Sequence, residues 1–167
     1  MLLGPILLLV AGTVLQTDCP PELRSDSWLC LVREVDLTAD DAVDTVVVRA
    51  TGRASDSLLI TLTIRVNGQE AWREEWASSY ELVDPPDFSS VSARDQYVRR
   101  SLQQTLESVS LAAFDRAGYE MMADAPDSVL LGEPPKYEIR FNYGYETTVV
   151  LMWDPASGSF RRLWTCC

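Results

Sequence analysis

Four cysteines are the residues of this chain that most plainly predict chemistry. They lie near its two ends, at Cys19, Cys30, Cys166 and Cys167. In an exported protein such a set predicts disulfide bonds, and four cysteines leave three connectivities open. A bond between Cys166 and Cys167 would strain a small ring of neighbouring residues, so we expect Cys30 to bond to one of these two. Neighbouring strand residues point to opposite faces, which leaves the other for Cys19 or for solvent.

A metal site is the alternative interpretation of these side chains. Two adjacent cysteines cannot easily place both sulfurs on one tetrahedral zinc ion, and the chain contains no His. A group of aspartates lacks the alternating ligand spacing and central glycine of a calcium loop: Asp36, Asp40, Asp41 and Asp44. We therefore expect a solvated acidic loop at these aspartates, and no metal or other cofactor.

Catalytic groups are sparse in this sequence. Without His, a nucleophile would need Ser or Tyr beside Lys, or a pair of carboxylates. The single lysine, Lys136, falls on the polar side of a predicted strand, where exposure to solvent is the ordinary expectation. The chain also lacks a glycine-rich phosphate loop and a nucleophile elbow. We therefore predict that the protein is not an enzyme.

The charge balance limits the partners. Lys and Arg number 14 against 25 Asp and Glu, which gives a net charge of −11. A protein this acidic repels phosphate backbones and anionic lipid surfaces. We expect no nucleic-acid partner, and contact with a membrane only through the N-terminal segment.

Residues 1–17 predict an export signal. They begin with an uncharged apolar run that has the length of a signal-peptide core and is too short for a membrane-spanning helix. The alternative is an N-terminal anchor that is never removed. Cys19 is a lipidation candidate, as in bacterial lipoproteins, although Asp18 directly before it fits that motif poorly.

One domain is expected after a short tether. Residues 18–27, DCPPELRSDS, are polar and rich in proline and predict the tether. Residues 28–167 are then numerous enough to bury one hydrophobic core without help from a metal.

Residues 28–68 predict three strands and a hairpin turn. The runs 28–35 and 45–50 are rich in β-branched side chains, and residues 58–66 alternate strictly between apolar and polar. Asn67 and Gly68 follow, and Asn-Gly between two strands is a strong hairpin signal.

The register of this hairpin is predicted from its aromatic residues. Setting Ile64 beside Trp72 and Ile60 beside Trp76 keeps the apolar side chains on one face. A plain two-residue loop would instead put the tryptophans on the other face, so we expect a glycine bulge at Gly68.

Residues 92–118 predict one long amphipathic helix. Ser92 can cap its beginning, and Gly118 is a natural terminator. Apolar residues recur at helical spacing: Val98, Leu102, Leu106, Val109 and Ala113.

Three more strands are predicted after this helix, at residues 137–143, 147–154 and 159–166. Asp154 to Gly158 should form a tight reversal, since the run DPASG combines Asp, Pro and Gly. A four-residue loop would pair Trp153 with Phe160 and Val149 with Trp164.

The order of strands, helix and strands, without βαβ alternation, predicts an α+β fold. The simplest arrangement is an antiparallel sheet of about six strands with one long amphipathic helix packed on one face.

Aromatic residues on this sheet are the candidate binding surface. They are Trp72, Trp76, Tyr80, Tyr143 and Tyr145. Packing in the core and across strands is the alternative role for most of them. A groove on the sheet face that the helix leaves open would use them to bind a ligand or partner.

Residues 56–114 resemble a known family. The run DSLLITLTIRVNGQEAWREEW, with a tryptophan after the turn glycine, is followed by the amphipathic RRSLQQTLESVSLAAF. This arrangement is similar to the sheet-and-helix units of periplasmic accessory lipoproteins related to curli secretion and penicillin-binding-protein activators. The resemblance implies a shared fold unit and a place in the cell envelope.

Together these features predict a bacterial cell-envelope protein, secreted to the periplasm or tethered to the membrane. We expect it to be a non-enzymatic binding or assembly module whose partner is another envelope protein. The alternative is a small periplasmic ligand-binding protein or hydrolase with an aromatic-lined pocket.

Overall fold

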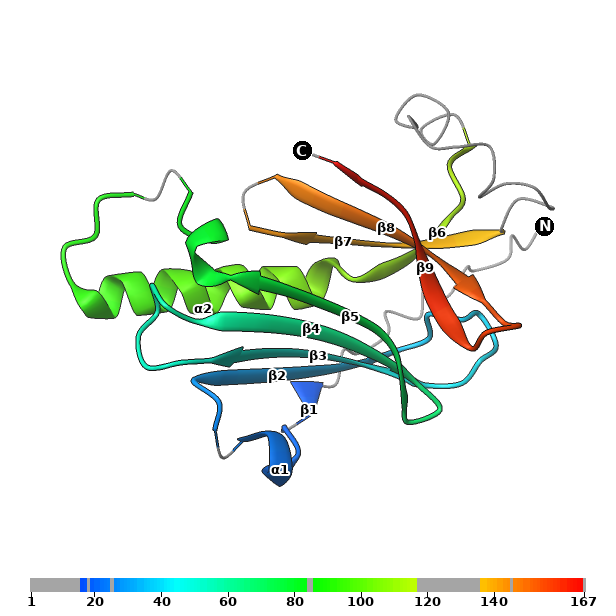
Figure 1. Ribbon diagram of the computed structural model, residues 1–167, viewed down its shortest axis with the longest axis horizontal. Helices are drawn as coiled ribbons and strands as arrows, with labels where there is room; N and C mark the ends of the chain where they lie inside the picture. The colour runs from blue at the N-terminus through cyan, green and yellow to red at the C-terminus, as the bar shows by residue number, and fades with distance from the viewer. Residues whose placement is uncertain are drawn as a thin grey trace, which may run out of the picture.

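Two antiparallel meanders flank one long helix in the computed structural model (Figure 1). The structure describes residues 16–17, 19–24, 26–83, 86–116, 136–144 and 146–166. Its elements in chain order are β1 (Gln16–Thr17), α1 (Pro21–Arg24), β2 (Leu29–Val35), β3 (Asp44–Thr51), β4 (Leu59–Val66), β5 (Gln69–Ala77), the 3₁₀ turn η1 (Ser78–Tyr80), α2 (Val91–Ser108), β6 (Ser110–Ala113), β7 (Tyr137–Tyr143), β8 (Thr147–Asp154) and β9 (Ser159–Cys166).

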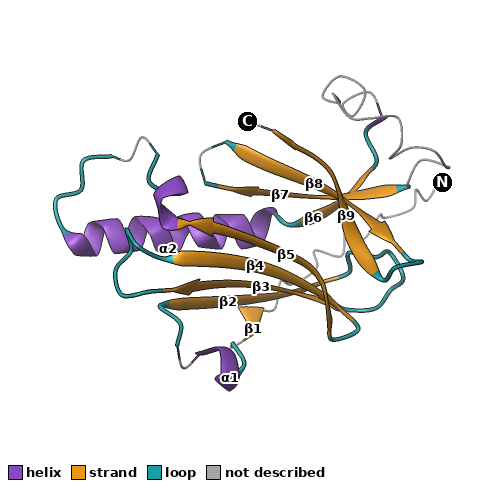
Figure 2. Cartoon of the chain, viewed as in Figure 1, coloured by secondary structure: helices purple, strands orange, loops and turns teal. Residues whose placement is uncertain are grey.

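The strands form two sheets, each antiparallel throughout. The first sheet has five strands in the order β1-β2-β3-β4-β5, and the second has four in the order β6-β7-β8-β9. Figure 2 shows α2 running along the first sheet and leading into β6 of the second. The predicted α+β class, antiparallel pairing and single long helix are confirmed, whereas the prediction of one continuous sheet is wrong. The predicted element order also differs in detail, because the short helix α1 precedes β2.

The connection after α2 explains the division into two sheets. α2 ends at Ser108 and β6 begins at Ser110, so only Val109 separates them. One residue spans less than about 4 Å, too little for the chain to return to an edge of the first sheet. The later strands therefore pair with one another, and β5 meets β9 through side chains such as the Glu74–Arg162 ion pair.

α2 is shorter than predicted and begins one residue earlier, at Val91. Ser90, not Ser92, is its N-cap, and the Ser90 hydroxyl accepts a hydrogen bond from the Ala93 N–H at 3.2 Å. The helix stops at Ser108, and Ser110–Ala113 pairs with β7 as a strand. The prediction of a helix to 118 is thus wrong, because pairing with a distant strand overrides the local helical spacing; Gly118 lies outside the described residues.

The β4–β5 hairpin has the predicted pairing with a different irregularity. Ile64 lies opposite Trp72 and Ile60 opposite Trp76, as expected. Asn67 and Gly68, however, both have positive φ (52° and 77°) and form the two-residue turn itself. The register shifts between Ile64 and Arg65, where Ala71 is the extra residue, so the predicted bulge at Gly68 is wrong.

The β8–β9 hairpin confirms two of its predicted features and contradicts a third. Trp153 lies opposite Phe160 as predicted, with ring centroids 4.8 Å apart. The Asp154–Gly158 reversal is also confirmed, because the Gly158 N–H donates to the Asp154 carbonyl at 2.9 Å. A register shift between Val150 and Leu151 then pairs Trp164 with Val150, so the predicted Val149–Trp164 pair is wrong.

One hydrophobic core joins the first sheet, α2 and the second sheet. Every second residue of β4 faces it, so that Ile60, Leu62 and Ile64 have no exposed surface. Leu102 of α2 and Phe141 of β7 are equally buried in the same cluster. This shared core holds the two sheets in one unit.

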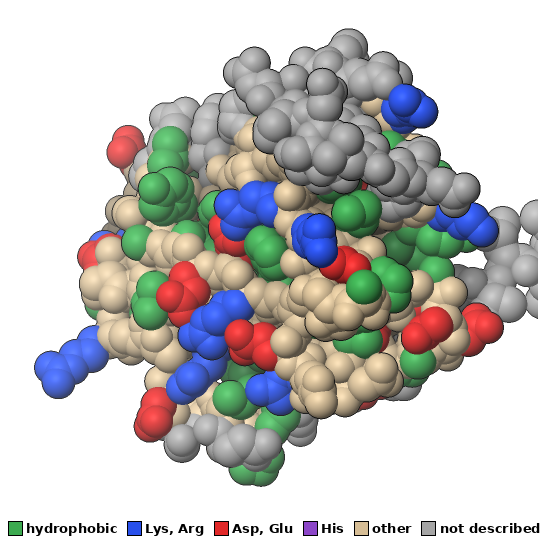
Figure 3. Space-filling view, turned by 45° about the vertical axis from the view of Figure 1, so that its right-hand side comes forward, with side chains coloured by type: hydrophobic (Ala, Val, Ile, Leu, Met, Phe, Trp, Pro, Cys, Tyr) green, Lys and Arg blue, Asp and Glu red, His purple; other side chains and the backbone are tan. Residues whose placement is uncertain are grey.

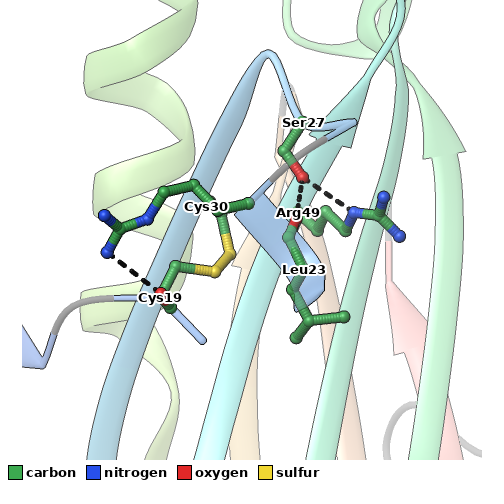
Figure 4. The surroundings of a disulfide bond; sticks show 6 residues. Cys19, Leu23, Ser27, Cys30 and Arg49 are labelled. Carbon is green, nitrogen blue, oxygen red and sulfur yellow. Dashed lines mark hydrogen bonds between the residues drawn. A yellow bond between two sulfur atoms is a disulfide. The ribbon is translucent and has the colours of Figure 1, made fainter. Parts of the chain in front are cut away.

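A disulfide joins Cys19 to Cys30, with their Cα atoms 5.9 Å apart (Figure 4). The predicted bond from Cys30 to the C-terminus is therefore wrong. Cys166 is disulfide-bonded as well, and its partner lies outside the described residues, as does Cys167. Closing the short loop before β2 stabilises the fold by about 3 kcal/mol in the chain-entropy model.

The segment predicted as a tether is partly structured. Pro21–Arg24 forms the short helix α1, and the disulfide fastens this region to β2. Residues 1–15 lie outside the described residues, so the export signal remains a prediction. Lipidation of Cys19 is an alternative to the disulfide, because its sulfur cannot bond to a lipid and to Cys30 at once. Among the described residues, no helix is both long enough and apolar enough to cross a membrane.

Candidate functional site

A groove of about 500 Å³ lies between the loop after β2 and the second sheet. We call it the apolar groove. Its described lining comes from four separate parts of the chain: Leu37, Thr38, Ala39, Leu111, Lys136, Tyr137, Ile139, Trp153 and Pro155. Clefts of this volume with mainly apolar and aromatic walls are the usual sites of small-molecule binding.

The apolar groove has a rigid floor and an exposed rim. Leu37 and Ile139 are each only 1% exposed and belong to the main core. Trp153 is held by its ring contact with Phe160 across the β8–β9 hairpin. Tyr137 is 48% exposed and stands at the rim. Because the floor is part of the core, the groove needs no rearrangement to exist.

Among the described residues that line the apolar groove, Lys136 is the one with a charged side chain. It is exposed, as the sequence predicts, and it directly precedes β7. A ligand with an apolar body and one negative group would therefore match this lining in both shape and charge.

Hydrogen bonds to two aspartates hold the loop that forms one wall of the apolar groove. The Asp36 carboxylate accepts hydrogen bonds from the backbone N–H groups of Ala39 (2.7 Å) and Asp41 (3.1 Å). Asp44 accepts from the Leu37 N–H at 2.8 Å and is only 1% exposed. The prediction of a solvated loop is therefore wrong for Asp44, whose carboxylate fixes the loop from inside.

Asp44 gives the loop a dependence on pH. Burial raises its pKa above the ordinary 3.8, and the charges of Asp40 and Asp36 add to the rise, against the opposing hydrogen bond from Leu37. The folded state then binds a proton more readily than the unfolded state. The free energy of unfolding of the protein therefore falls as the pH rises from the ordinary pKa of an aspartate through the raised pKa of Asp44.

We expect Asp44→Asn to remove this pH dependence. The difference in unfolding free energy, wild type minus variant, should grow as the pH is lowered from 7 toward 4, measured by urea unfolding. Asp26→Asn, at an exposed position, is the control. The difference between its unfolding free energy and that of wild type should not change with pH. A difference for Asp44→Asn that does not change with pH would contradict this account.

The predicted aromatic surface is mostly a packed contact between the sheets. Trp76 is 5% exposed and stacks on Tyr143 with ring centroids 4.4 Å apart. Arg162 lies over the Trp72 ring at 5.3 Å, and Tyr80 is 54% exposed. The structure thus brings these four aromatic residues together where β5, β7 and β9 meet, while Tyr145 lies outside the described residues.

Electrostatic contacts hold the same region together. The Tyr143 hydroxyl donates to Glu74 at 3.4 Å, and Glu74 also pairs with Arg162. Burial raises the pKa of Tyr143, and the Glu74 charge adds to the rise. Tyr143 therefore stays protonated well above neutral pH and serves as a donor.

Glu81 is the residue in this region that sequence analysis missed. It is 3% exposed and accepts hydrogen bonds from Trp76 Nε1 at 2.6 Å, from the Gly144 N–H at 3.1 Å, and from the Ser101 hydroxyl. These donors belong to β5, the β7–β8 turn and α2. No local pattern marks this glutamate, because its partners are distant in sequence.

Charge on the outside of the molecule is mixed. Figure 3 shows acidic and basic side chains interspersed over one face, with hydrophobic side chains between them. Within the described residues, no cluster of three or more side chains is arranged to hold a metal ion. Comparisons with protein-family models, curated proteins and solved structures find no match to this chain.

Proposed function

We propose that this protein is a non-enzymatic binding module of the cell envelope that holds a small amphiphile in the apolar groove. The ligand class is an aliphatic or aromatic molecule with one carboxylate. The size of the groove and its described lining, in which Lys136 is the cation, carry this proposal. An envelope partner that presents such a group is the predicted biological source.

The cell-envelope location is supported by the cysteines. The Cys19–Cys30 bond fits an oxidising compartment, where disulfides persist. The apolar run at residues 1–17 agrees with export.

Dodecanoate and dodecanol are the probes that test the groove, with binding measured by calorimetry on the oxidised chain. We expect one dodecanoate per chain, and Leu111→Glu should weaken it at least tenfold by placing a charge against the apolar wall. Val91→Glu is the matched control, because Val91 is 64% exposed at the start of α2 and does not line the groove. Equal binding by both variants would refute the proposal.

A variant of Lys136 separates the contribution of charge to ligand binding from that of apolar contact. Lys136→Met should weaken dodecanoate binding by about fivefold, the ordinary worth of an exposed ion pair, and leave dodecanol unchanged. Loss of both ligands to the same extent would mean that Lys136 acts only through packing.

A further inference from the structure

A second hollow lies on the opposite face of the first sheet, turned away from α2. Thr61 and Thr63 of β4 lie within its lining, and three arginines stand around them: Arg49 of β3, Arg65 of β4 and Arg73 of β5. We call it the arginine pocket. Its volume is about 80 Å³, far smaller than the apolar groove.

Strand pairing places these side chains on one face. Arg49 lies opposite Thr61, and Arg73 lies opposite Thr63. Directly paired residues of antiparallel strands point to the same side, and so do residues two apart on one strand. Arg65 therefore shares the face of Thr63, which is only 9% exposed.

Many hydrogen-bond donors in the arginine pocket are free. Among the residues that the structure describes, the Arg65 guanidinium and the hydroxyls of Thr61 and Thr63 have no hydrogen-bond partner. Arg49 donates only through Nε, to the Ser27 hydroxyl at 2.8 Å, so its two terminal nitrogens remain available. Four side chains, Arg49, Thr61, Thr63 and Arg65, thus offer hydrogen-bond donors to this space that the fold does not use.

The charge of the arginine pocket is opposite to that of the whole chain. The described part of its lining contains three guanidinium groups and one carboxylate, Glu70, in a protein of net charge −11. Arg73 is already paired with Glu75 at 2.6 Å and lies 3.7 Å from Glu70. Arg49 and Arg65 therefore provide the excess positive charge that an anion would meet.

The Cys19–Cys30 disulfide supports one wall of the arginine pocket. Leu23 of α1 lines the pocket and packs against the small cluster of Cys19, Val32 and Val47. In Figure 4 the Ser27 hydroxyl bridges the Leu23 carbonyl and Arg49, so that the bonded segment also orients one of the arginines. The wall and the Arg49 side chain are therefore held by the same covalent loop.

We propose that the arginine pocket binds a single phosphate group. Guanidinium forks and hydroxyls are strong donors to phosphate oxygens, and this set offers more donors than the two oxygens of a carboxylate can accept. The pocket admits one such group, whereas the net negative charge of the chain disfavours a polyanion. This site is separate from the apolar groove, and its occupation does not depend on the proposed function.

Titration with inorganic phosphate on the oxidised full chain tests the proposal. We expect one phosphate per chain, and both Arg65→Ala and Thr63→Val should weaken it, the first at least tenfold. Thr63→Val keeps the branched shape and replaces the hydroxyl with a methyl group. Arg53→Ala is the control, since Arg53 is exposed in the β3–β4 turn and does not line the pocket; it should bind within twofold of wild type.

Vesicles of phosphatidylcholine with and without phosphatidylglycerol identify the source of the phosphate. If the chain binds inorganic phosphate and Arg65→Ala weakens that binding, the ligand is soluble. If the chain binds only the vesicles with phosphatidylglycerol and Arg65→Ala weakens that binding, the ligand is a lipid headgroup. No binding in either experiment would overturn the proposal. Equal weakening by Arg53→Ala and Arg65→Ala would also overturn it, because it would show a general charge effect. Circular dichroism confirms that each variant is folded.

Discussion

Glu81→Ala should lower the free energy of unfolding by about 3 kcal/mol or more, because it leaves three donors without an acceptor. Trp76 Nε1 and the Ser101 hydroxyl lose a charged partner, and so does the Gly144 N–H. Each unsatisfied buried donor costs about 1–3 kcal/mol, and water entering the space left by the side chain recovers part of this loss. Urea unfolding followed by tryptophan fluorescence measures the change.

Two further variants distinguish the loss of a buried hydrogen-bond acceptor from the loss of a negative charge. Glu81→Gln can keep an oxygen toward Trp76 and Gly144 while its amide donates to the Ser101 hydroxyl, so we expect a loss of about 1 kcal/mol. Glu75→Ala removes a carboxylate that is 44% exposed, and its effect should stay within about 0.5 kcal/mol. Similar losses for Glu81→Ala and Glu75→Ala would show that the three hydrogen bonds do not hold the sheets together.

Sequence patterns were sufficient where neighbours along the chain decide the structure. The alternation in β4 identified the buried face of Ile60 and Ile64, and the need to keep apolar side chains together gave their correct tryptophan partners. The position of the irregularity was not predictable in the same way. A bulge at Gly68 and one at Ala71 give the same pairing of Ile64 with Trp72, and only the backbone distinguishes them.

The end of α2 shows the limit of periodicity. Val109 and Ala113 continue the helical spacing, so the pattern itself contains no stop. The structure instead uses Ser110–Ala113 to pair with β7, a strand that begins more than twenty residues later. Such a pairing depends on a distant segment, and the same reason explains why the second sheet was not foreseen.

The candidate sites were foreseen only in part. Trp153 and Lys136 were recognised as a cross-strand aromatic and an exposed lysine, and the groove between them needs Leu37 from a loop about a hundred residues away. The cysteine partner of Cys30 was also misassigned, because the preceding segment was interpreted as a tether and not as a helix docked on the sheet.

Gly144→Ala should be strongly destabilising, with a loss of about 3 kcal/mol or more in the free energy of unfolding. Gly144 has φ +57°, a left-handed conformation that costs other residues about 1–2 kcal/mol. An added Cβ would also lie 2.8 Å from the Tyr80 carbonyl oxygen and 3.1 Å from the Tyr80 Cβ, so that one of the two segments must move. That movement would stretch the hydrogen bond from the Gly144 N–H to Glu81, which joins the β7–β8 turn of the second sheet to the segment directly after η1.

Gly158→Ala provides the matched control for this prediction. Gly158 has a similar φ of +64° in the β8–β9 turn, and an added Cβ would meet nothing within 4 Å. We therefore expect a loss of about 1 kcal/mol, from backbone strain alone. Because the two glycines share their backbone conformation, the difference between their unfolding free energies measures the close contact with Tyr80. Equal losses at Gly144 and Gly158 would mean that this contact relaxes freely and that the sheets are not held tightly at this point.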